Sequence, residues 1–534
     1  MFRRMSTASS GTGARARWLV VVVAVMLAAA ACANDADSSD ESSDTAPGSE
    51  LTRADIEATL PGLDEIVEEA MDETGVPGIA VGVVFEDEVM LTKGYGVRTV
   101  GEDESVNRDT VFQVASLSKP ISSTVVAGVV GDGTIAWDDP VAPYLPGFAL
   151  SDPWVTTHVT FEDLFAHRSG LPGGAGNDLE SVGYDRAQIM ERLRYEPLDP
   201  FRATYSYSNF GLTTAGEAAA RAAGMSWEEL AETELFEPAG MTSTSMSHDD
   251  YVAAANRASL HVDVDGSWEA AFERMPDAQA PAGGVSSNVV DLVKWLRLQL
   301  AGGSLDGGQI VDEDALDQTH TPMIMKSPPS PTIADPATFY GLGWNIDVDD
   351  TGAIRWNHSG AFSVGASTTA KLLPGADLGI VVLTNGEPIG VPEAITDAYF
   401  ELVQTGEVTQ DWIEIWGERF SGLYGPTEDW STPPTDAAPA APDESYVGTY
   451  RNDYVGDVDV VAVDGGLVIV EGPQGMEFPL EHWDGNTFIY PHDAELPDYR
   501  STVIFDIGSD GVASAVTIDT FDSSGLGTLL RVSP

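Results

Sequence analysis

Apolar residues follow a helical period at the start of the region that we expect to fold. From Leu51 onward, the stretch "LTRADIEATLPGLDEIVEEAMDETG" repeats apolar residues every three or four positions, with carboxylates between them. The apolar residues that can share one helix face are Ile56, Leu60, Leu63, Ile66, Val67 and Ala70. The next stretch, "GIAVGVVFEDEVMLTKGYGVRT", predicts two strands joined by a turn at Glu86 and Asp87.

The middle of the chain reads as helical, and a run of strands follows it. Residues 150 to 300 alternate short helical patterns with glycine and proline loops such as "HRSGLPGGAGND", and "VVDLVKWLRLQL" predicts an amphipathic helix. Residues 340 to 387 change period, so "YGLGWNIDV", "IRWNHSG", "FSVGASTTAKLLP" and "LGIVVLTNG" predict consecutive strands, and "PEAITDAYFELVQT" predicts a helix after them. This order favours an α+β fold in which helices cover a sheet and the early strands complete the sheet formed by the late ones.

The C-terminal part has a composition of its own. The stretch "YGPTEDWSTPPTDAAPAAPDES" is rich in proline and alanine, which keeps a chain extended, so residues 421–445 are predicted to be a linker. Residues 446–534 alternate short strand patterns with glycine and Asp-Gly turns. They predict a small all-β domain, either a barrel or a sandwich.

The N-terminus is typical of an export signal. Arginines precede the apolar residues 18–31, which are too few for an ordinary membrane span of about 20 residues but suit a signal peptide. Cys32 follows directly and is the only cysteine, so it cannot form an internal disulfide; its position resembles the acylated cysteine of a bacterial lipoprotein. We therefore expect a signal peptide with a lipoprotein cysteine over residues 1–32 and an acidic, disordered tether over 33–50. Plain secretion is the alternative.

Charge excludes several classes of partner. The chain has 85 acidic and 26 basic residues, a net charge of −59. Such a protein repels phosphate backbones, which argues against nucleic-acid binding, and also repels anionic lipid headgroups. We expect contact with a membrane only through the N-terminal lipid.

One of the few lysines stands in the stretch "VFQVASLSKP", three residues after a serine. Ser116 and Lys119 can lie on one face of a helical turn. The residues before them are apolar, and so are most of those after them in "ISSTVVAGVV". Burying a lysine there is costly unless it is paired or deprotonated, and a deprotonated lysine can activate a serine as a nucleophile. Taken alone, a Ser-x-x-Lys string is weak evidence, because many sequences contain one by chance, and it favours a helix N-cap with an exposed lysine.

Two further strings complete a known pattern. Tyr207 and Asn209 stand in "ATYSYSNFGLTTAGEAAA", and His358 and Gly360 stand in "WNHSGAFSVGAST". In this order, together with "HRSGLP", "PAGGVSSNVVDLVKWL" and "YGLGWNI", the strings resemble the serine β-lactamase and penicillin-binding-protein superfamily, most closely its class C β-lactamase and esterase-like branch. The resemblance covers residues from about 55 to 405. It implies a β-lactamase/transpeptidase-like domain over 51–420, with an antiparallel sheet flanked by helices and a helical subdomain.

The resemblance also implies roles for single residues. Ser116 would attack a carbonyl carbon and form an acyl-enzyme, and either Lys119 or Tyr207 would be the base. Asn209 would bind the substrate and fix Lys119. The backbone N–H groups of Ser116 and Ala361 would form the oxyanion hole.

The third string departs from the usual pattern. Lysine is usual at the position of His358, where it binds a substrate carboxylate, and a neutral histidine would bind one less strongly. This favours esters or peptides over β-lactams. Gly360 would let the strand approach the substrate closely. His167, in "HRSGLP", could be taken for a base but looks structural in this family, and Tyr340 is expected to be a core or rim aromatic.

The sequence thus indicates an exported serine hydrolase that acts on esters, small peptides or cell-wall fragments. The alternatives are a true β-lactamase or D-Ala-D-Ala carboxypeptidase, and a non-catalytic penicillin-binding or sensor protein. The chemistry needs no metal or organic cofactor, and the sequence has no HExxH-type spacing. It does not predict the oligomeric state.

Overall fold

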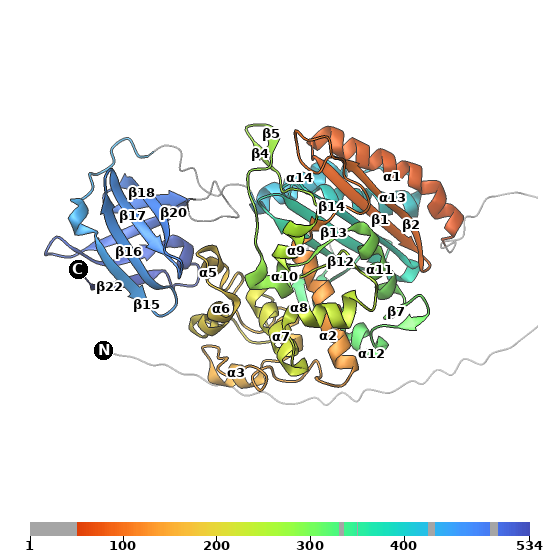
Figure 1. Ribbon diagram of the computed structural model, residues 1–534, viewed down its shortest axis with the longest axis horizontal. Coiled ribbons are helices and arrows are strands. Elements are labelled where there is room, and N and C mark those ends of the chain that lie inside the picture. The colour runs from red at the N-terminus through yellow and green to blue at the C-terminus, as the bar shows by residue number, and fades with distance from the viewer. Residues whose placement is uncertain (1–50, 330–335, 350, 425–432, 492–499, 534) are drawn as a thin grey trace, which may run out of the picture. The chain divides into compact units, whose positions relative to one another are not determined.

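The computed structural model of this chain describes residues 51–329, 336–349, 351–424, 433–491 and 500–533. The predicted signal peptide, Cys32 and the predicted tether lie outside the described residues, as does part of the predicted linker. The described residues belong to one structural unit, which holds a larger α+β part and a C-terminal barrel (Figure 1).

The first elements follow the order that the hydrophobic pattern predicts. They are α1 (Arg53–Thr74), β1 (Gly78–Phe85) and β2 (Glu88–Gly96). The Thr52 side chain accepts the N–H of Asp55, whose carboxylate accepts the N–H of Thr52, so a capping box starts the helix. Of the six apolar residues assigned to one face, four are fully buried, and Leu60 and Ile66 are partly buried.

An antiparallel sheet of eight strands forms the centre of the larger part, in the order β2-β1-β14-β13-β12-β11-β10-β9 (Figure 1). The later strands are β9 (Ile324–Ser327), β10 (Thr338–Tyr340), β11 (Asn345–Val348), β12 (Ile354–Phe362), β13 (Ala366–Leu373) and β14 (Leu378–Thr384). Strand β1 pairs with β14, with Ile79 opposite Thr384, so the early strands complete the late sheet as predicted. One strand prediction is corrected: "YGLGWNIDV" is the end of β10, a turn and β11, because Gly343 adopts a left-handed φ of 85° and reverses the chain.

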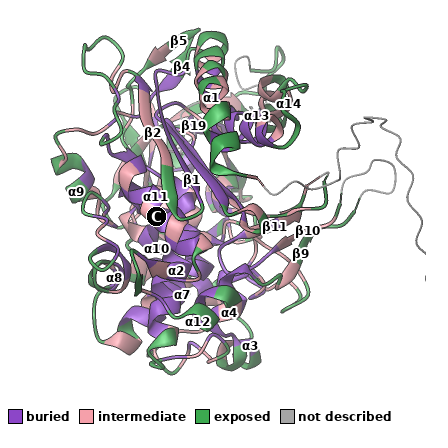
Figure 2. Cartoon of the chain, turned by 90° about the vertical axis from the view of Figure 1, so that its right-hand side faces the viewer, coloured by how far each residue is buried: buried purple, intermediate pink, exposed green. Residues whose placement is uncertain are grey.

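Helices cover both faces of the sheet. Helices α1, α13 (Val391–Thr405) and α14 (Trp412–Tyr424) form one layer. On the other face, α11 (Val289–Leu300) packs on β1 and β14, and α2 (Ser118–Gly131) and α10 (Ala280–Gly283) lie beyond it. Strands β1, β13 and β14 are therefore buried along their whole length, and the central strands are purple in Figure 2. The predicted α+β fold class is confirmed.

Further helices and three two-stranded ribbons complete the larger part within the described residues. The helices are α3 (Pro153–His158), α4 (Phe161–Phe165), α5 (Asn177–Ser181), α6 (Arg186–Arg192), α7 (Asn209–Ala223), α8 (Trp227–Ala231), α9 (His248–Ala253) and α12 (Glu313–Asp317). The ribbons are β3 (Phe112–Gln113) with β6 (Ser286–Ser287), β4 (Val262–Val264) with β5 (Ser267–Glu269), and β7 (Ser304–Leu305) with β8 (Gly308–Gln309).

The C-terminal domain is a closed barrel, which resolves the choice between barrel and sandwich. Its strands are β15 (Gly448–Asn452), β16 (Gly456–Val463), β17 (Gly466–Glu471), β18 (Met476–Asp484), β19 (Thr487–Pro491), β20 (Arg500–Ile507), β21 (Ala513–Ile518) and β22 (Thr528–Ser533). Strand β15 pairs with β22 and so closes the ring, which leaves no strand edge open. Tyr446, Tyr450 and Tyr490 are completely buried.

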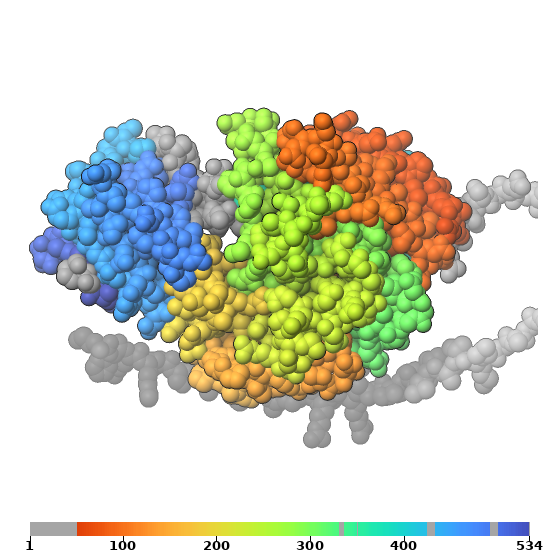
Figure 3. Space-filling view, viewed as in Figure 1, coloured from red at the N-terminus to blue at the C-terminus, as the bar shows by residue number. Residues whose placement is uncertain are grey.

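The barrel contacts the larger part at α5 and the loop after it (Figure 3). Tyr184 donates a hydrogen bond to the carbonyl oxygen of Val455, and Tyr454 donates one to Asp178 Oδ1 at 2.7 Å. The pKa of the Asp178 carboxyl is raised to about 7, mainly by burial; the hydrogen bond from Tyr454 opposes this rise and the nearby Glu196 adds to it. A carboxyl that is protonated near neutrality therefore lies in this contact.

This carboxyl should make stability depend on pH. The pKa of Asp178 is about 7 in the folded protein and 3.8 as the ordinary value, so between these pH values the folded state holds a proton that the unfolded state has released. Stability should therefore fall as pH rises from about 4 to about 7, by up to about 1.4 kcal/mol per pH unit. Asp178→Asn removes this loss. We expect it to equal the wild type at pH 4 and to be more stable by about 1–3 kcal/mol at pH 8, as measured by urea unfolding.

The exposed Asp103 provides the control, since Asp103→Asn changes the net charge equally. In Asp103→Asn we expect no gain in stability over the wild type that appears at pH 8 and is absent at pH 4. If Asp178→Asn is no more stable than the wild type at pH 8, the buried carboxyl does not carry the proton assigned to it.

Candidate active site

Ser116 and Lys119 meet at the start of α2, which is buried from Ser118 to Val129. Ser116 lies in a single 3₁₀ turn (Ala115–Leu117) that runs directly into α2. Lys119 is completely buried, and its Nζ lies 2.9 Å from Ser116 Oγ. The residue before the serine, Ala115, has a left-handed φ of 48°, a strained backbone of the kind that clusters at functional sites.

The surroundings of Lys119 favour its neutral form. Burial holds the pKa of the lysine well below its ordinary value of 10.5. Its second contact is the carbonyl oxygen of Ala282, to which Nζ donates at 2.9 Å. Ala282 belongs to α10. A deprotonated amine 2.9 Å from a hydroxyl can accept its proton.

Tyr207 lies in the loop before α7, and its ring faces the lysine. Lys119 Nζ is 4.7 Å from the centroid of the Tyr207 ring. The imidazole of His167 lies on the same ring, with centroids 4.4 Å apart. The structure therefore brings together the serine, the lysine and the tyrosine that the sequence assigns to one site, although about 90 residues separate the tyrosine from the other two.

Asn209 is the first residue of α7, and its contacts differ from those expected. Its Nδ2 donates to Asn177 Oδ1 at 3.4 Å, and its Oδ1 is buried with no hydrogen-bond partner among the described residues. The polar contacts of Lys119 are Ser116 and Ala282 instead. The expectation that Asn209 fixes Lys119 is therefore corrected, because the carbonyl of α10 holds the amine; binding of substrate by Asn209 stays a prediction.

Strand β12 carries the third string along the site. His358 is buried, and its Nε2 accepts a hydrogen bond from the Tyr340 hydroxyl at 2.9 Å, while Nδ1 donates to the carbonyl oxygen of Ser359 at 2.7 Å. Burial, with a smaller contribution from Lys119, lowers the pKa of His358 to about 3. The imidazole is therefore neutral at physiological pH, and both of its nitrogens already have partners. Neither nitrogen is therefore free to bind a substrate in the way that the sequence predicts.

Gly360 and Ala361 lie where β12 meets the turn that holds the serine. A Cβ at position 360 would overlap the carbonyl oxygen of Val114 and lie 2.9 Å from the amide nitrogen of Leu117. The close approach that the glycine permits is thus to the backbone around Ser116, and not only to a substrate as the sequence analysis expects. This packing places the backbone of Ala361, the predicted second oxyanion donor, next to that turn.

Tyr340 is part of the site, although the sequence predicts only a core or rim aromatic at this position. The ring is indeed completely buried. Its hydroxyl nevertheless donates to Nε2 of His358, whose proton is on Nδ1 because the Ser359 carbonyl there can only accept. No spacing in the sequence indicates this contact, because it depends on how β10, β11 and β12 align in the sheet.

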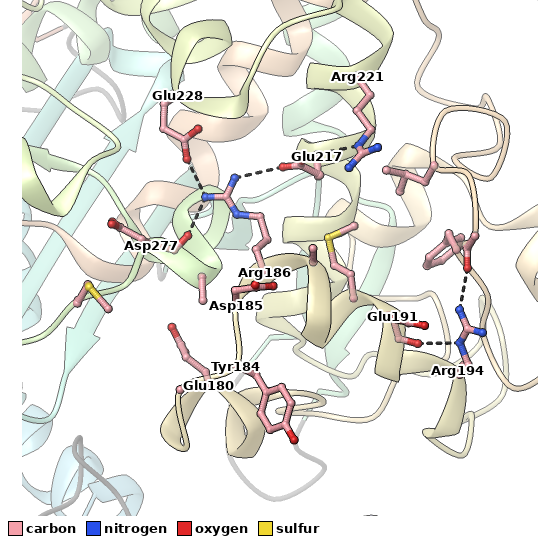
Figure 4. A pocket seen from close by; sticks show the side chains of 18 of the residues that line it. Glu180, Tyr184, Asp185, Arg186, Glu191, Arg194, Glu217, Arg221, Glu228 and Asp277 are labelled. Atoms are coloured by element: carbon pink, nitrogen blue, oxygen red, sulfur yellow. Dashed lines mark hydrogen bonds and ion pairs between the residues drawn. The ribbon is translucent and has the colours of Figure 1, made fainter. Parts of the chain in front are cut away.

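A separate cavity of about 1020 Å³ lies among α5, α6 and α7. Arg186 donates hydrogen bonds to Glu217 and Glu228 across it, at 3.1 and 2.7 Å (Figure 4). Ser116, Lys119 and Tyr207 are not among the described residues that line it. The cavity is therefore distinct from the site assembled around the serine.

Among the residues that the structure describes, no three His, Cys, Asp or Glu side chains are grouped so that they could hold a metal ion. No helix there is both long and apolar enough to cross a membrane.

Comparison with known proteins establishes the family. Residues 63–404 match the family model described as Beta-lactamase, so the chain belongs to the β-lactamase family of serine hydrolases. Residues 432–528, which include most of the barrel, match a model described as a domain of unknown function, DUF3471. The resemblance inferred from the three strings is thereby confirmed.

Curated relatives are similar over most of their length. The chain is 26% identical over 418 residues to Unguisins hydrolase ungD' of Aspergillus campestris, covering 73% of this chain and 74% of the relative. It is 27% identical over 390 residues to Penicillin-binding protein 4 of Amycolatopsis lactamdurans, covering 71% and 94%.

Solved structures show the same fold. The octameric penicillin-binding protein homologue from Pyrococcus abyssi gives a TM-score of 0.56 at 18% identity, covering 88% of this chain and all of that one. SurE gives a TM-score of 0.54 at 21% identity, covering 90% and 99%. SurE has also been solved with D-Leu, and that structure gives a TM-score of 0.52.

Proposed function

We propose that this protein is an exported serine hydrolase that forms an acyl-enzyme at Ser116 and cleaves esters or small peptides. The observation that carries the proposal is Lys119, which is completely buried, 2.9 Å from Ser116 Oγ and above the Tyr207 ring. The chain is rich in carboxylates, yet none of the described ones pairs with Lys119, which is explained best by a neutral amine that serves as a base.

The proposed reaction has two halves. Ser116 Oγ attacks the carbonyl carbon while its proton passes to Lys119, alone or with Tyr207, and the N–H groups of Ser116 and Ala361 stabilise the oxyanion. Collapse of the intermediate breaks the bond to the leaving group, which takes the proton. Water then attacks the acyl ester with the same base and releases the serine. No cofactor takes part in this scheme.

The state of His358 supports substrates without a carboxylate next to the scissile bond. A buried, neutral imidazole that already bonds Tyr340 offers no positive charge to a carboxylate. β-Lactams and D-Ala-D-Ala peptides carry such a carboxylate, so both are disfavoured. A relative named for hydrolysis of unguisins and a similar structure solved with D-Leu support amides of D-amino acids as test substrates.

Export through the N-terminal signal, with lipid on Cys32, remains part of the proposal. It rests on the order of arginines, apolar residues and a single cysteine in the sequence. The C-terminal barrel would then lie outside the cell with the hydrolase part.

A fluorophosphonate probe tests the proposal directly. The probe should label the wild type, and peptide mass mapping should place the label on Ser116; Ser116→Ala should stay unlabelled. Wild-type protein that has not met the probe should turn over p-nitrophenyl esters or D-amino-acid amides faster than a chromogenic cephalosporin. Fast turnover of the cephalosporin would favour a true β-lactamase, labelling without any turnover would favour a sensor, and absence of labelling would remove the proposal.

A further inference from the structure

His167 adopts an unusual backbone conformation next to the site. It follows α4 in the stretch "HRSG" and has a left-handed φ of 54°, although it is not a glycine. The residue is buried, with 2% of its surface exposed. Non-glycine residues persist in this conformation only where their surroundings hold them, and such residues cluster at functional sites.

Two hydrogen bonds join His167 to the residues on either side of Tyr207. The carbonyl oxygen of His167 accepts the N–H of Ser206 at 2.9 Å. Its Nδ1 accepts the N–H of Ser208 at 3.1 Å. Between these two bonds the imidazole lies on the Tyr207 ring, with centroids 4.4 Å apart. One residue therefore holds the chain before, at and after Tyr207.

These contacts also fix the protonation of the imidazole. A backbone N–H can only donate, so Nδ1 is an acceptor and the proton is on Nε2. Burial, with Lys119 and His358 as smaller contributors, lowers the pKa of His167 well below its ordinary value. The other titratable rings that face it are Tyr205 and Tyr340. His167 is thus neutral. The N–H of Ser208 occupies its acceptor nitrogen, so His167 cannot take a proton from Ser116.

We propose that His167 is a positioning residue that holds the Tyr207 ring against Lys119. The inference rests on the proposed function, because it matters only if Tyr207 and Lys119 act on Ser116. The left-handed turn at His167 aims both of its acceptors, one from the backbone and one from the side chain, at the N–H groups that flank the tyrosine. Without the side-chain acceptor the buried N–H of Ser208 is left unpaired, and the loop that carries Tyr207 shifts to pair it with another group.

The test compares two variants that both tolerate the left-handed backbone. Asparagine visits this conformation and its Oδ1 can replace Nδ1 as the acceptor, whereas glycine visits it freely but offers no acceptor. His167→Asn should keep kcat within about threefold of the wild type. His167→Gly should lose about 10- to 100-fold in kcat with KM changed by less than about twofold, as expected for a misplaced catalytic group. Both are assayed on an ester well below their melting temperatures.

The pH profile gives a readout that a purely structural role would not move. The acidic limb of kcat/KM reports ionisation in the Lys119–Tyr207 pair. In His167→Gly it should move to higher pH by at least about half a unit, because a displaced Tyr207 ring uncovers Lys119 and the loss of burial raises the pKa of the lysine. In His167→Asn the limb should stay in place.

The outcomes separate this inference from the proposed function. If the wild type takes no label at Ser116, the proposed function itself fails. If the wild type is labelled but His167→Gly keeps its kcat and pH profile, the positioning role is refuted and the hydrolase reading stands. Equal losses in the two variants also refute it, since the acceptor would then make no difference. Should His167→Gly not fold, a loss of tenfold or more in His167→Asn decides against it, and activity near the wild type decides for it.

Discussion

Ser116→Ala, Lys119→Met and the double variant are expected to fall to the same residual activity, roughly 10⁴-fold or more below the wild type in kcat. The serine supplies the nucleophile and the lysine accepts its proton, so neither is useful without the other. When two groups act as a unit, removing the second costs little once the first is gone. The double variant should therefore lie within about threefold of either single variant.

Stability should respond differently from activity in this series. Lys119 is completely buried, and methionine has a similar length without the cost of placing an amine in an apolar environment. Against this gain stands the hydrogen bond to the carbonyl of Ala282, which is lost. We expect Lys119→Met to melt within a few degrees of the wild type, so its inactivity cannot be ascribed to unfolding.

A matched control is available on the surface. Lys93 is a half-exposed lysine on β2 that pairs with Asp64 at 2.7 Å. Three strands separate β2 from β12, the strand that packs on the turn with Ser116. Lys93→Met makes the same substitution and should keep full kcat. Activity of Lys119→Met above one tenth of the wild type would falsify the assignment of Lys119 to the base.

Gly360→Ala is expected to give the second largest effect, a loss of about 100-fold or more in kcat together with a lower melting temperature. The added methyl would overlap the carbonyl oxygen of Val114 and lie 2.6 Å from Thr368 Oγ1 and 2.9 Å from the nitrogen of Leu117. Two of these three atoms belong to the backbone, which cannot move aside as a flexible side chain can. Strand β12 must therefore shift away from the turn that holds Ser116.

Such a shift separates the two predicted oxyanion donors. The N–H of Ala361 moves with β12, while the N–H of Ser116 stays with the turn. Loss of one such donor costs about 2.7–4 kcal/mol of transition-state stabilisation. Overpacking of a tight contact adds a cost of about 1–3 kcal/mol to the folded state. Both effects have one cause, so they should appear together.

Gly375→Ala is the control for this prediction. Gly375 lies between β13 and β14 of the same sheet, and a Cβ there would meet nothing within 4 Å. This variant should keep the kcat and the melting temperature of the wild type. If Gly360→Ala keeps both as well, β12 can yield without disturbing the serine, and the oxyanion hole does not depend on this contact.

Much of the fold was predictable because its signals are local. The short apolar runs of β1 and β14, the apolar face of α1 and the turn residues between barrel strands are each properties of fewer than about 20 residues. Ser116 and Lys119 belong to this group, since three residues on a helical turn place two side chains on one face. The apolar residues on both sides of the pair indicated that the lysine would be buried, and it is completely buried.

The sequence by itself thus determined the α+β class, the all-β C-terminal domain and the candidate residues of the site. Only the tertiary structure decided what those residues contact. Lys119 donates a hydrogen bond to the carbonyl of Ala282, and the hydroxyl of Tyr340 donates one to His358. His167 accepts hydrogen bonds from the residues before and after Tyr207. Periodicity says which face of an element is apolar, but not which distant element covers that face. That choice depends on strand register and on the packing of segments separated by tens to hundreds of residues, which no short stretch of the chain contains.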